Sequence, residues 1–311
     1  MLILDEKKIR KGKPIGLPYQ GSKKKISKKI IEIIKQNFGT DKIIYDIFGG
    51  GGAITAEFLL NGLSVYYNDL DKDATDMFLK VISEDKEYLK TLLVSREEFF
   101  RIRDKDDKTV DDNLKLLINS FGNNNESYLY GKEHADIKYR LALEIIKRHD
   151  VFSGYKQTQT WKNQFCVLQQ LQRLQQLERL QQLQQLQQLE RLQQLERLQQ
   201  LERLQQLQQL QRLEQLHITN LDYKSFSDVK DAVFYLDPPY ENTKQYYKGD
   251  TFDSQSFYDW AYEMSKKNIV LISSYEISDD RFKCVYEFKT AKSTLQSGGA
   301  GKRYEKLFMV K

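Results

Sequence analysis

The sequence predicts an α/β fold built on an open, mainly parallel sheet. Residues 232–236 are an unbroken apolar run, which is typical of a strand buried on both faces of a parallel sheet. A predicted strand at 42–47 runs into four glycines, and a helix at 53–60 follows. The next strand, 63–67, ends in Asn68-Asp69. This order of strand, glycine turn, helix, strand and acid indicates one half of a nucleotide-binding sheet.

The remaining elements follow from apolar periodicity and helix-ending residues. Glycine closes the first helix, and Asn61-Gly62 closes the second. The other predicted elements are a helix at 26–38, strands at 217–221 and 268–273, a helix at 254–267, and strands at 284–290 and 304–310.

Composition narrows the class of protein. A chain of 311 residues can form one large α/β domain with an appendage, or two domains. Its net charge of +5 permits nucleic-acid binding without requiring it, and the basic, acid-free stretch 7–29 is either a solvated tail or a phosphate-binding arm. Two cysteines and three scattered histidines give no disulfide framework and no metal-ligand spacing. Without a signal peptide or a long apolar run, we expect a soluble intracellular protein with no membrane partner.

The glycine turn predicts the kind of ligand. Its residues let the backbone approach a ligand closely and reach positive φ, and the helix behind them offers unpaired N–H groups; they are Gly49, Gly50, Gly51 and Gly52. They do not spell the dinucleotide pattern and lack the lysine of a phosphate loop, which favours an adenosine-type ligand without a pyrophosphate, S-adenosylmethionine above all. Asp69, about 20 residues on, can accept the ribose hydroxyls. Asp46 can face the amino group of the ligand.

The central strand ends in Asp237-Pro238-Pro239-Tyr240. Consecutive prolines hold Asp237 extended at the carboxyl end of the strand, where ligands bind in open α/β sheets. Asp237 and the Pro238 carbonyl can accept both hydrogens of an amino group on a planar ring, and Tyr240 can stack on that ring. The alternative is a stiff turn that carries a surface tyrosine.

Candidate DNA contacts lie in three stretches. The helical, charged middle of the chain contains a segment rich in amides and aromatics, which either contacts bases or forms an ordered loop with left-handed asparagines. A polar aromatic loop follows Tyr240, and the basic arm precedes the first helix. The candidates are Lys24, Lys25, Asn123, Asn124, Tyr128, Lys244, Tyr246 and Tyr247.

A low-complexity insert spans 168–216, with leucine at every third of its positions. Its residues are good helix formers, but a period of 3.0 matches neither a straight helix nor a coiled coil. Each leucine steps back by about 60° around an α-helix, so a lone helix would expose leucine on all sides. We therefore favour helices packed together, with a solenoid as the alternative. The insert is either a spacer or a surface for self-association or a protein partner.

Together these motifs resemble the Dam-like (D12 class) DNA adenine-N6 methyltransferases, of phage or prophage type. The matching pieces, in order, are Pro18-Tyr19-Gln20-Gly21-Ser22-Lys23, the Asp46-Ile-Phe-Gly-Gly-Gly-Gly turn, Asn68-Asp69, Asn119-Ser-Phe-Gly-Asn-Asn, Asp237-Pro-Pro-Tyr and Ser273-Ser-Tyr. The resemblance implies a Rossmann-like, S-adenosylmethionine-dependent methyltransferase sheet. We expect a catalytic domain from 1–75 and 217–311, a mainly helical DNA-recognition region at 76–167, and the repeat insert at 168–216.

The resemblance also implies roles for single residues. Tyr19 and Lys23 would lie near the methionine end of the cofactor, with Phe48, Gly50 and Gly52 as its cradle and Asp69 at the ribose. Asp237 and Tyr240 would bind an adenine flipped out of double-stranded DNA, for direct methyl transfer to N6. The expected setting is the cytoplasm of a bacterial or phage-infected cell, with a cognate restriction nuclease as a partner. Because the family's specificity region lies where this chain has its helical middle and the repeat insert, the recognition sequence stays open.

Three other functions remain open on the sequence. The first is an exocyclic-amine methyltransferase that acts on cytosine N4, RNA adenine or protein glutamine; the leading aspartate of Asp237-Pro-Pro-Tyr favours adenine. The second is a DNA- or partner-binding remnant without catalysis, against which the intact motifs count. The third is a nicotinamide oxidoreductase, which the glycine pattern disfavours.

Overall fold

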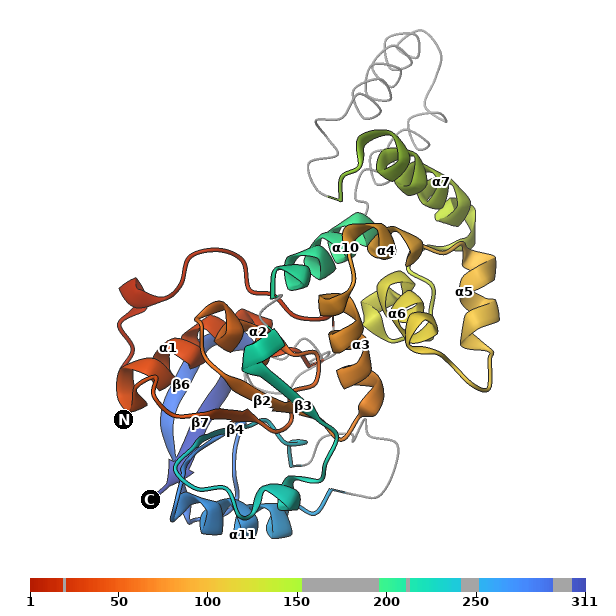
Figure 1. The fold of residues 1–311 in the computed structure, drawn as a ribbon. Helices are drawn as coiled ribbons and strands as arrows, with labels where there is room; N and C mark the ends of the chain where they lie inside the picture. Colours follow the sequence, from red (N-terminus) through yellow and green to blue (C-terminus); the bar gives the residue numbers. More distant parts are fainter. Residues whose placement is uncertain (19–20, 153–195, 211–212, 242–251, 293–303) are drawn as a thin grey trace, which may run out of the picture. The chain divides into compact units, whose positions relative to one another are not determined.

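The computed structural model describes residues 1–18, 21–152, 196–210, 213–241, 252–292 and 304–311. The chain divides into two compact units (Figure 1), one made of Met1–Ile82 with Gln209–Lys311 and the other of Ser83–Gln208. Most of the repeat insert lies outside the described residues, so its treatment as a separate region stays a prediction.

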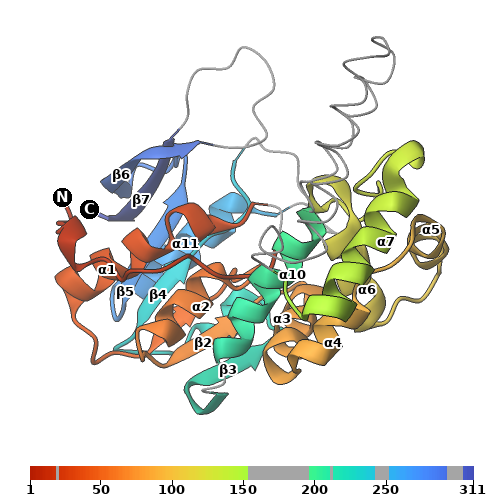
Figure 2. The same cartoon turned by 90° about the horizontal axis from the view of Figure 1, so that it is seen from above.

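The first unit is built on a mixed sheet, which confirms the predicted α/β fold. In the described part of the chain seven strands pair in the order β3-β2-β1-β4-β5-β7-β6, with β3 and β6 at opposite edges (Figures 1 and 2). The strands β1 to β5 pair in parallel, whereas β7 runs antiparallel to both β5 and β6. Their bounds are β1 Ile44–Asp46, β2 Val65–Asn68, β3 Leu216–Thr219, β4 Val233–Leu236, β5 Ile269–Ser274, β6 Phe282–Lys292 and β7 Tyr304–Val310.

The strand order creates a switch point at the centre of the sheet. From β1 the chain moves outward to β2 and β3, and it then returns to place β4 on the other side of β1. Asp46, the last residue of β1, pairs with Tyr235 of β4. The carboxyl ends of both strands therefore meet where open α/β sheets bind their ligands, and Asp237 follows directly after β4.

The antiparallel strand β7 brings one more residue to this edge. Ser273 and Ser274, at the end of β5, pair with Leu307 and Lys306. Because β7 runs in the opposite direction, its first residues lie where the parallel strands end. Glu305, the second residue of β7, thus reaches the same edge as Asp237.

Helices cover both faces of the sheet. Figure 1 shows α11 (Ser254–Ser265) on one face and α1 (Ser27–Phe38) and α2 (Ala53–Leu60) on the other. The helix α2 is buried on nearly every side, as its apolar sequence requires. The helix α3 (Lys72–Ser83) follows β2, and its Phe78 ring packs edge-on against Tyr67 with ring centroids 5.0 Å apart. The helices α1, α2 and α11 each begin and end within two residues of their predicted bounds.

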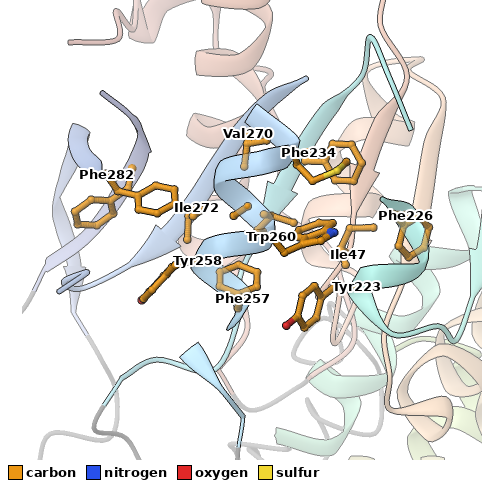
Figure 3. Close-up of a cluster of buried hydrophobic side chains, with 14 of the residues drawn as sticks. Ile47, Tyr223, Phe226, Phe234, Phe257, Tyr258, Trp260, Val270, Ile272 and Phe282 are labelled. Carbon is orange, nitrogen blue, oxygen red and sulfur yellow. The ribbon is translucent and has the colours of Figure 1, made fainter. Parts of the chain in front are cut away.

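The core beneath α11 is aromatic. Figure 3 shows Phe257 and Trp260 of α11 among Phe234 and Ile272 of the sheet. On the same face, four rings stack across neighbouring strands: Phe234 on Tyr45 at 4.8 Å, Tyr45 on Tyr66 at 4.6 Å, and Tyr66 on His217 at 4.4 Å. Each stacked pair is also a cross-strand pair of the parallel ladders. Such pairs help to fix the register of the strands that carry the edge described above.

The second unit is helical in its described residues. Its helices are α4 Lys86–Thr91, α5 Arg96–Arg103, α6 Val110–Asn119, α7 Lys132–His149 and α10 Glu196–Leu207. Side chains of Asp85 and Ser95 cap α4 and α5, and Thr109 with Asp112 forms a capping box on α6. A small core of Phe99, Ile102 and neighbouring side chains joins α5 to α6.

The described end of the repeat insert is helical, as the sequence favoured. In α10 three backward steps of about 60° spread four leucines over about half of the helix circumference. All four leucines of α10 are buried, namely Leu198, Leu201, Leu204 and Leu207. Leu210, in the short 3-10 turn that follows, is buried too. Since α10 packs against both α4 and α6, this wide apolar face is covered within the second unit.

Candidate active site

The centre of the site is the aspartate that follows β4. Asp237 Oδ2 lies 2.6 Å from Nζ of Lys23, which belongs to the short 3-10 turn Lys23–Lys25. Glu305 Oε1 lies 4.0 Å from the same nitrogen. The exposed fractions of these three side chains are 13% for Lys23, 16% for Asp237 and 6% for Glu305, so one ammonium serves two largely buried carboxylates.

Tyr240 joins the two carboxylates. Its hydroxyl lies 3.1 Å from Asp237 Oδ1 and donates a short hydrogen bond to Glu305 Oε1. The ring of Tyr275, which follows β5, meets the Tyr240 ring edge-on with centroids 4.8 Å apart. Lys23 Nζ lies 5.0 Å from the centre of the Tyr240 ring. The ring is therefore fixed both at its hydroxyl and along its edge.

The charges of this group follow from burial and from each other. Burial raises the pKa of Asp237 to about 6; the Lys23 ammonium opposes that rise and the Glu305 carboxylate adds to it. Burial lowers the pKa of Lys23, but Asp237 and Glu305 outweigh this, so the pKa of Lys23 is raised. Burial and both acids hold the pKa of Tyr240 well above its ordinary value. At neutral pH Asp237 is ionised, Lys23 is charged and Tyr240 keeps its proton.

The glycine turn after β1 is held by hydrogen bonds and close packing. Gly50 N–H donates to Asp69 Oδ2 at 2.7 Å, and the Tyr67 hydroxyl donates to the Gly50 carbonyl at 2.6 Å. A Cβ on Gly49 would lie 2.2 Å from the Tyr67 ring, and one on Gly52 would lie 2.4 Å from the Phe78 ring. Gly52 also has a φ of 67°, in the left-handed region. Glycine is required at both positions for these reasons.

Asp46 has an acceptor atom without a partner. Its Oδ2 accepts hydrogen bonds from Thr55 N–H at 3.1 Å and from Thr55 Oγ1 at 2.7 Å. Its Oδ1 is buried and has no hydrogen-bond partner among the described residues. Burial raises the pKa of Asp46 to about 7. A buried carboxylate oxygen of this kind fits a donor group of a ligand beside the glycine turn.

Asp69 supports the turn from the end of β2. Its second oxygen, Oδ1, accepts from Asp71 N–H at 2.8 Å. Burial raises the pKa of Asp69 to about 6. Asn68, one residue earlier, donates to the Ile47 and Leu221 carbonyls and ties the ends of β1 and β3 to β2. Each Asp69 oxygen already accepts one hydrogen bond, and a carboxylate oxygen can accept two, so a ligand hydroxyl can still be bound there.

A comparison with protein families agrees with this geometry. The family model of the D12 class N6 adenine-specific DNA methyltransferases matches residues 19–294, which include the glycine turn and Asp237-Pro-Pro-Tyr. The chain belongs to this family. It is therefore an adenine-specific DNA methyltransferase with a Rossmann-like sheet, of a class of enzymes that generally use S-adenosylmethionine. A comparison with curated proteins found no match.

The other sequence-predicted residues of the methyltransferase lie in different settings. Phe48 packs edge-on against Phe257, with ring centroids 5.6 Å apart, at the rim of the aromatic core. Pro238 and Pro239 follow β4 as predicted, without a cis peptide bond. Tyr19, Lys244, Tyr246 and Tyr247 lie outside the described residues. Of the basic arm, Lys24 is half-buried and Lys25 is exposed.

The amide-rich stretch of the methyltransferase adopts the ordered-loop alternative. Asn123 has a left-handed φ of 56°, and its amide donates to the Leu117 carbonyl at 3.0 Å. The Asn124 side chain accepts two backbone N–H bonds at 3.0 Å. Tyr128 is buried, and its hydroxyl donates to the Val94 carbonyl at 3.0 Å. In this structure Tyr128 is a core residue, so its predicted stacking on a base has no exposed ring face to use.

The roles of Glu305 and of Thr55, the partner of Asp46, were not predicted from the sequence. The signal for Thr55 was its place in the first turn of the helix after the glycines, where its N–H is free to bind a preceding acid. For Glu305 the signal was an acid at the start of a predicted final strand, which has meaning only once that strand is known to be antiparallel. Within the described part of the methyltransferase no cluster of three or more potential metal ligands occurs, and no helix there is long and apolar enough to cross a membrane.

Proposed function

We propose that this methyltransferase transfers a methyl group from S-adenosylmethionine to N6 of an adenine that is flipped out of double-stranded DNA. The observation that carries the proposal is the geometry of Asp237, whose carboxylate is held between the Lys23 ammonium and the Tyr240 hydroxyl at the end of β4. The family and the orphaned Asp46 oxygen support it. A cognate restriction nuclease stays a prediction from the sequence.

Base flipping follows from where N6 lies in a duplex. The amino group is inside the base stack and out of reach of a side chain anchored at a sheet edge, so the base must leave the stack at a cost of a few kcal/mol. A flipped adenine would be held by stacking on the Tyr240 ring. Its amino group would donate to Asp237 and to the Pro238 carbonyl, because both accept and the prolines fix their directions.

These two acceptors would also activate the nitrogen. When both N6 hydrogens are bound, the nitrogen lone pair is drawn out of conjugation with the ring and made available for methylation. Positive charge develops on N6 as it is methylated, and the Asp237 carboxylate stabilises that charge. The methylated nitrogen then loses a proton, and Asp237, with a pKa of about 6, is placed to accept it.

The cofactor would lie beside the glycine turn. When bound, S-adenosylmethionine supplies an electrophilic methyl group on a positively charged sulfur. Asp46 Oδ1 would accept from a donor group of the cofactor, and Asp69 would accept from its ribose hydroxyls. Lys23 would remain paired with Asp237 and keep that carboxylate oriented towards the base.

The experiment is methyl transfer by Asp237→Ala, read together with cofactor affinity. We expect transfer to fall by more than about 100-fold, because the acceptor for the developing charge is lost, while S-adenosylmethionine binding measured by calorimetry persists. Asp228→Ala, which removes an exposed aspartate before the amino end of β4, is the matched control and should keep wild-type activity. Retained transfer in Asp237→Ala would remove Asp237 from the mechanism.

A further inference from the structure

Glu305 is the acid on which the polar groups around Asp237 converge. Its Oε1 accepts a hydrogen bond from Ser273 Oγ at 2.8 Å and a short one from the Tyr240 hydroxyl. The same oxygen lies 4.0 Å from Lys23 Nζ. Glu305 is 5% exposed, so these contacts replace the water that the carboxylate would otherwise bind.

The position of Glu305 is set by the sheet rather than by a loop. Ser273 pairs with Leu307, which places Glu305 on the diagonal two residues along β7. On the other side of β7, Glu305 pairs with Phe288 of β6. An acid held between two neighbouring strands has little freedom to move, as is required of a group that orients others.

We infer that Glu305 is a positioning residue of the methyltransferase, which accepts the hydrogen bond of the Tyr240 hydroxyl and thereby leaves Asp237 Oδ1 available to the amino group of the target base. This inference rests on the proposed function. It assigns to the last strand of the sheet a part in substrate binding that neither the motif around Asp237 nor the glycine turn contains.

The Tyr240 hydroxyl can donate only one hydrogen bond. Tyr240 has one hydroxyl proton but two carboxylates in reach, Asp237 Oδ1 at 3.1 Å and the closer Glu305 Oε1. A phenol donates one hydrogen bond at a time. With Glu305 present, the hydroxyl donates its hydrogen bond to Glu305. Without Glu305 it turns to Asp237 Oδ1 and competes with the N6 hydrogens of the base for that oxygen.

The charge of Glu305 also affects the pKa of Asp237. Among the described residues, the ionisable groups that interact electrostatically with Asp237 include Lys23, Asp46, Asp69, Tyr235, Tyr240 and Glu305. Among them the Glu305 carboxylate raises the pKa of Asp237, so removal of its charge lowers that pKa below about 6. Since methyl transfer needs ionised Asp237, the acid limb of the pH–rate profile moves to lower pH.

The test compares Glu305→Ala with Glu305→Gln in steady-state methylation of duplex DNA across pH 5 to 8. We expect Glu305→Ala to lower kcat by about 10- to 100-fold, because both the base and Tyr240 lose their geometry, with S-adenosylmethionine affinity unchanged. Glu305→Gln keeps an oxygen that can accept from Tyr240 and Ser273, so its kcat should return to within about 3-fold of wild type at pH 8. Its acid limb should still move to lower pH, because its charge is gone.

Two further variants make the test specific. In a Tyr240→Phe background the hydroxyl is absent, so adding Glu305→Ala should change kcat little. Glu287→Gln, which alters an exposed acid on the neighbouring strand β6, should leave both kcat and the pH profile unchanged. A wild-type kcat and acid limb in Glu305→Ala would overturn the inference, as would an unmoved acid limb in Glu305→Gln if the alanine variant does not fold. If the wild-type enzyme methylates DNA in the same assay, the proposed function stands whether or not the inference about Glu305 is overturned.

Discussion

At the scale of single residues, the described part of the site gathers carboxylates around the Lys23 ammonium. Asp46, Asp69, Asp237 and Glu305 lie at the carboxyl edge of the sheet, where Lys23 is the cation paired with two of them. Burial is the largest cause of the raised pKa of both Asp46 and Asp69, and the charge of Asp237 raises both further. An excess of negative charge in a largely buried site suits a positively charged methyl donor.

Burial of the Asp46 carboxylate is expected to lower the stability of the protein in exchange for a ligand-binding group. Its pKa rises from 3.8 to about 7 on folding, chiefly through burial. Between these values the folded state holds a proton that the unfolded state has released, so the free energy of unfolding falls as pH rises from about 4 to 7. Asp46→Asn should therefore be more stable than the wild type by about 1–4 kcal/mol above pH 7, and equally stable below about pH 4.

Urea unfolding of the ligand-free protein at pH 4 and pH 8 measures this difference. Asp228→Asn, at an exposed aspartate, is the matched control and should show no difference at either pH. The stabilised Asp46→Asn variant should also bind S-adenosylmethionine more weakly, because the orphaned oxygen is replaced by a donor. A stability gap that is the same at both pH values would contradict the assigned burial of an ionised carboxylate.

At the scale of elements, the leucine repeat shows how a three-residue period can be buried by an α-helix. The four leucines of α10 cover about half of its circumference, which is wide enough to meet two helices, α4 and α6. Beyond Leu207 the chain tightens into a 3-10 turn, in which residues three apart lie one above the other. Leu210, at the end of this turn, is buried as well.

This packing predicts a large effect of a single leucine. Leu201→Ala should lower the free energy of unfolding of the second unit by about 2–5 kcal/mol, because it leaves a cavity at a fully buried position. Gln199→Ala, at an exposed position of the same helix, should change it by less than about 0.5 kcal/mol. Guanidinium unfolding, monitored by hydrogen exchange of the amides in α4 and α6, measures the change in free energy of unfolding for both variants. Equal effects of the two substitutions would mean that α10 is not part of this core.

Elements marked by local residue patterns could be predicted from the sequence, whereas contacts set by long-range packing could not. The helix α2 lies within its predicted bounds, and β4 differs by one residue, because glycine, proline and apolar runs mark both locally. The position of Glu305 could not be predicted, because it depends on the direction of β7 relative to β5, which is a long-range property. Tyr128 illustrates the opposite error: an aromatic in an amide-rich loop suggested base stacking, while tertiary packing placed the ring in a core.

At the scale of the whole molecule, the candidate site is assembled from segments far apart in the chain. Lys23, Asp46 and Asp69 precede the second unit in sequence, whereas Asp237 and Glu305 follow it, and all five belong to the first unit. The first unit therefore forms from both ends of the chain, and the family match across residues 19–294 includes Lys23, Asp46, Asp69 and Asp237 but ends before Glu305.

Methylation of adenine N6 in DNA is tested most directly by identifying the methylated nucleoside. The full chain is incubated with S-adenosylmethionine labelled with tritium in the methyl group and with unmethylated duplex DNA, and the DNA is then digested to nucleosides. We predict that the label appears in N6-methyl-2′-deoxyadenosine and is absent with Asp237→Ala. Label in N4-methyl-2′-deoxycytidine, or DNA without label from a protein that binds the cofactor, would contradict adenine N6 of DNA as the acceptor.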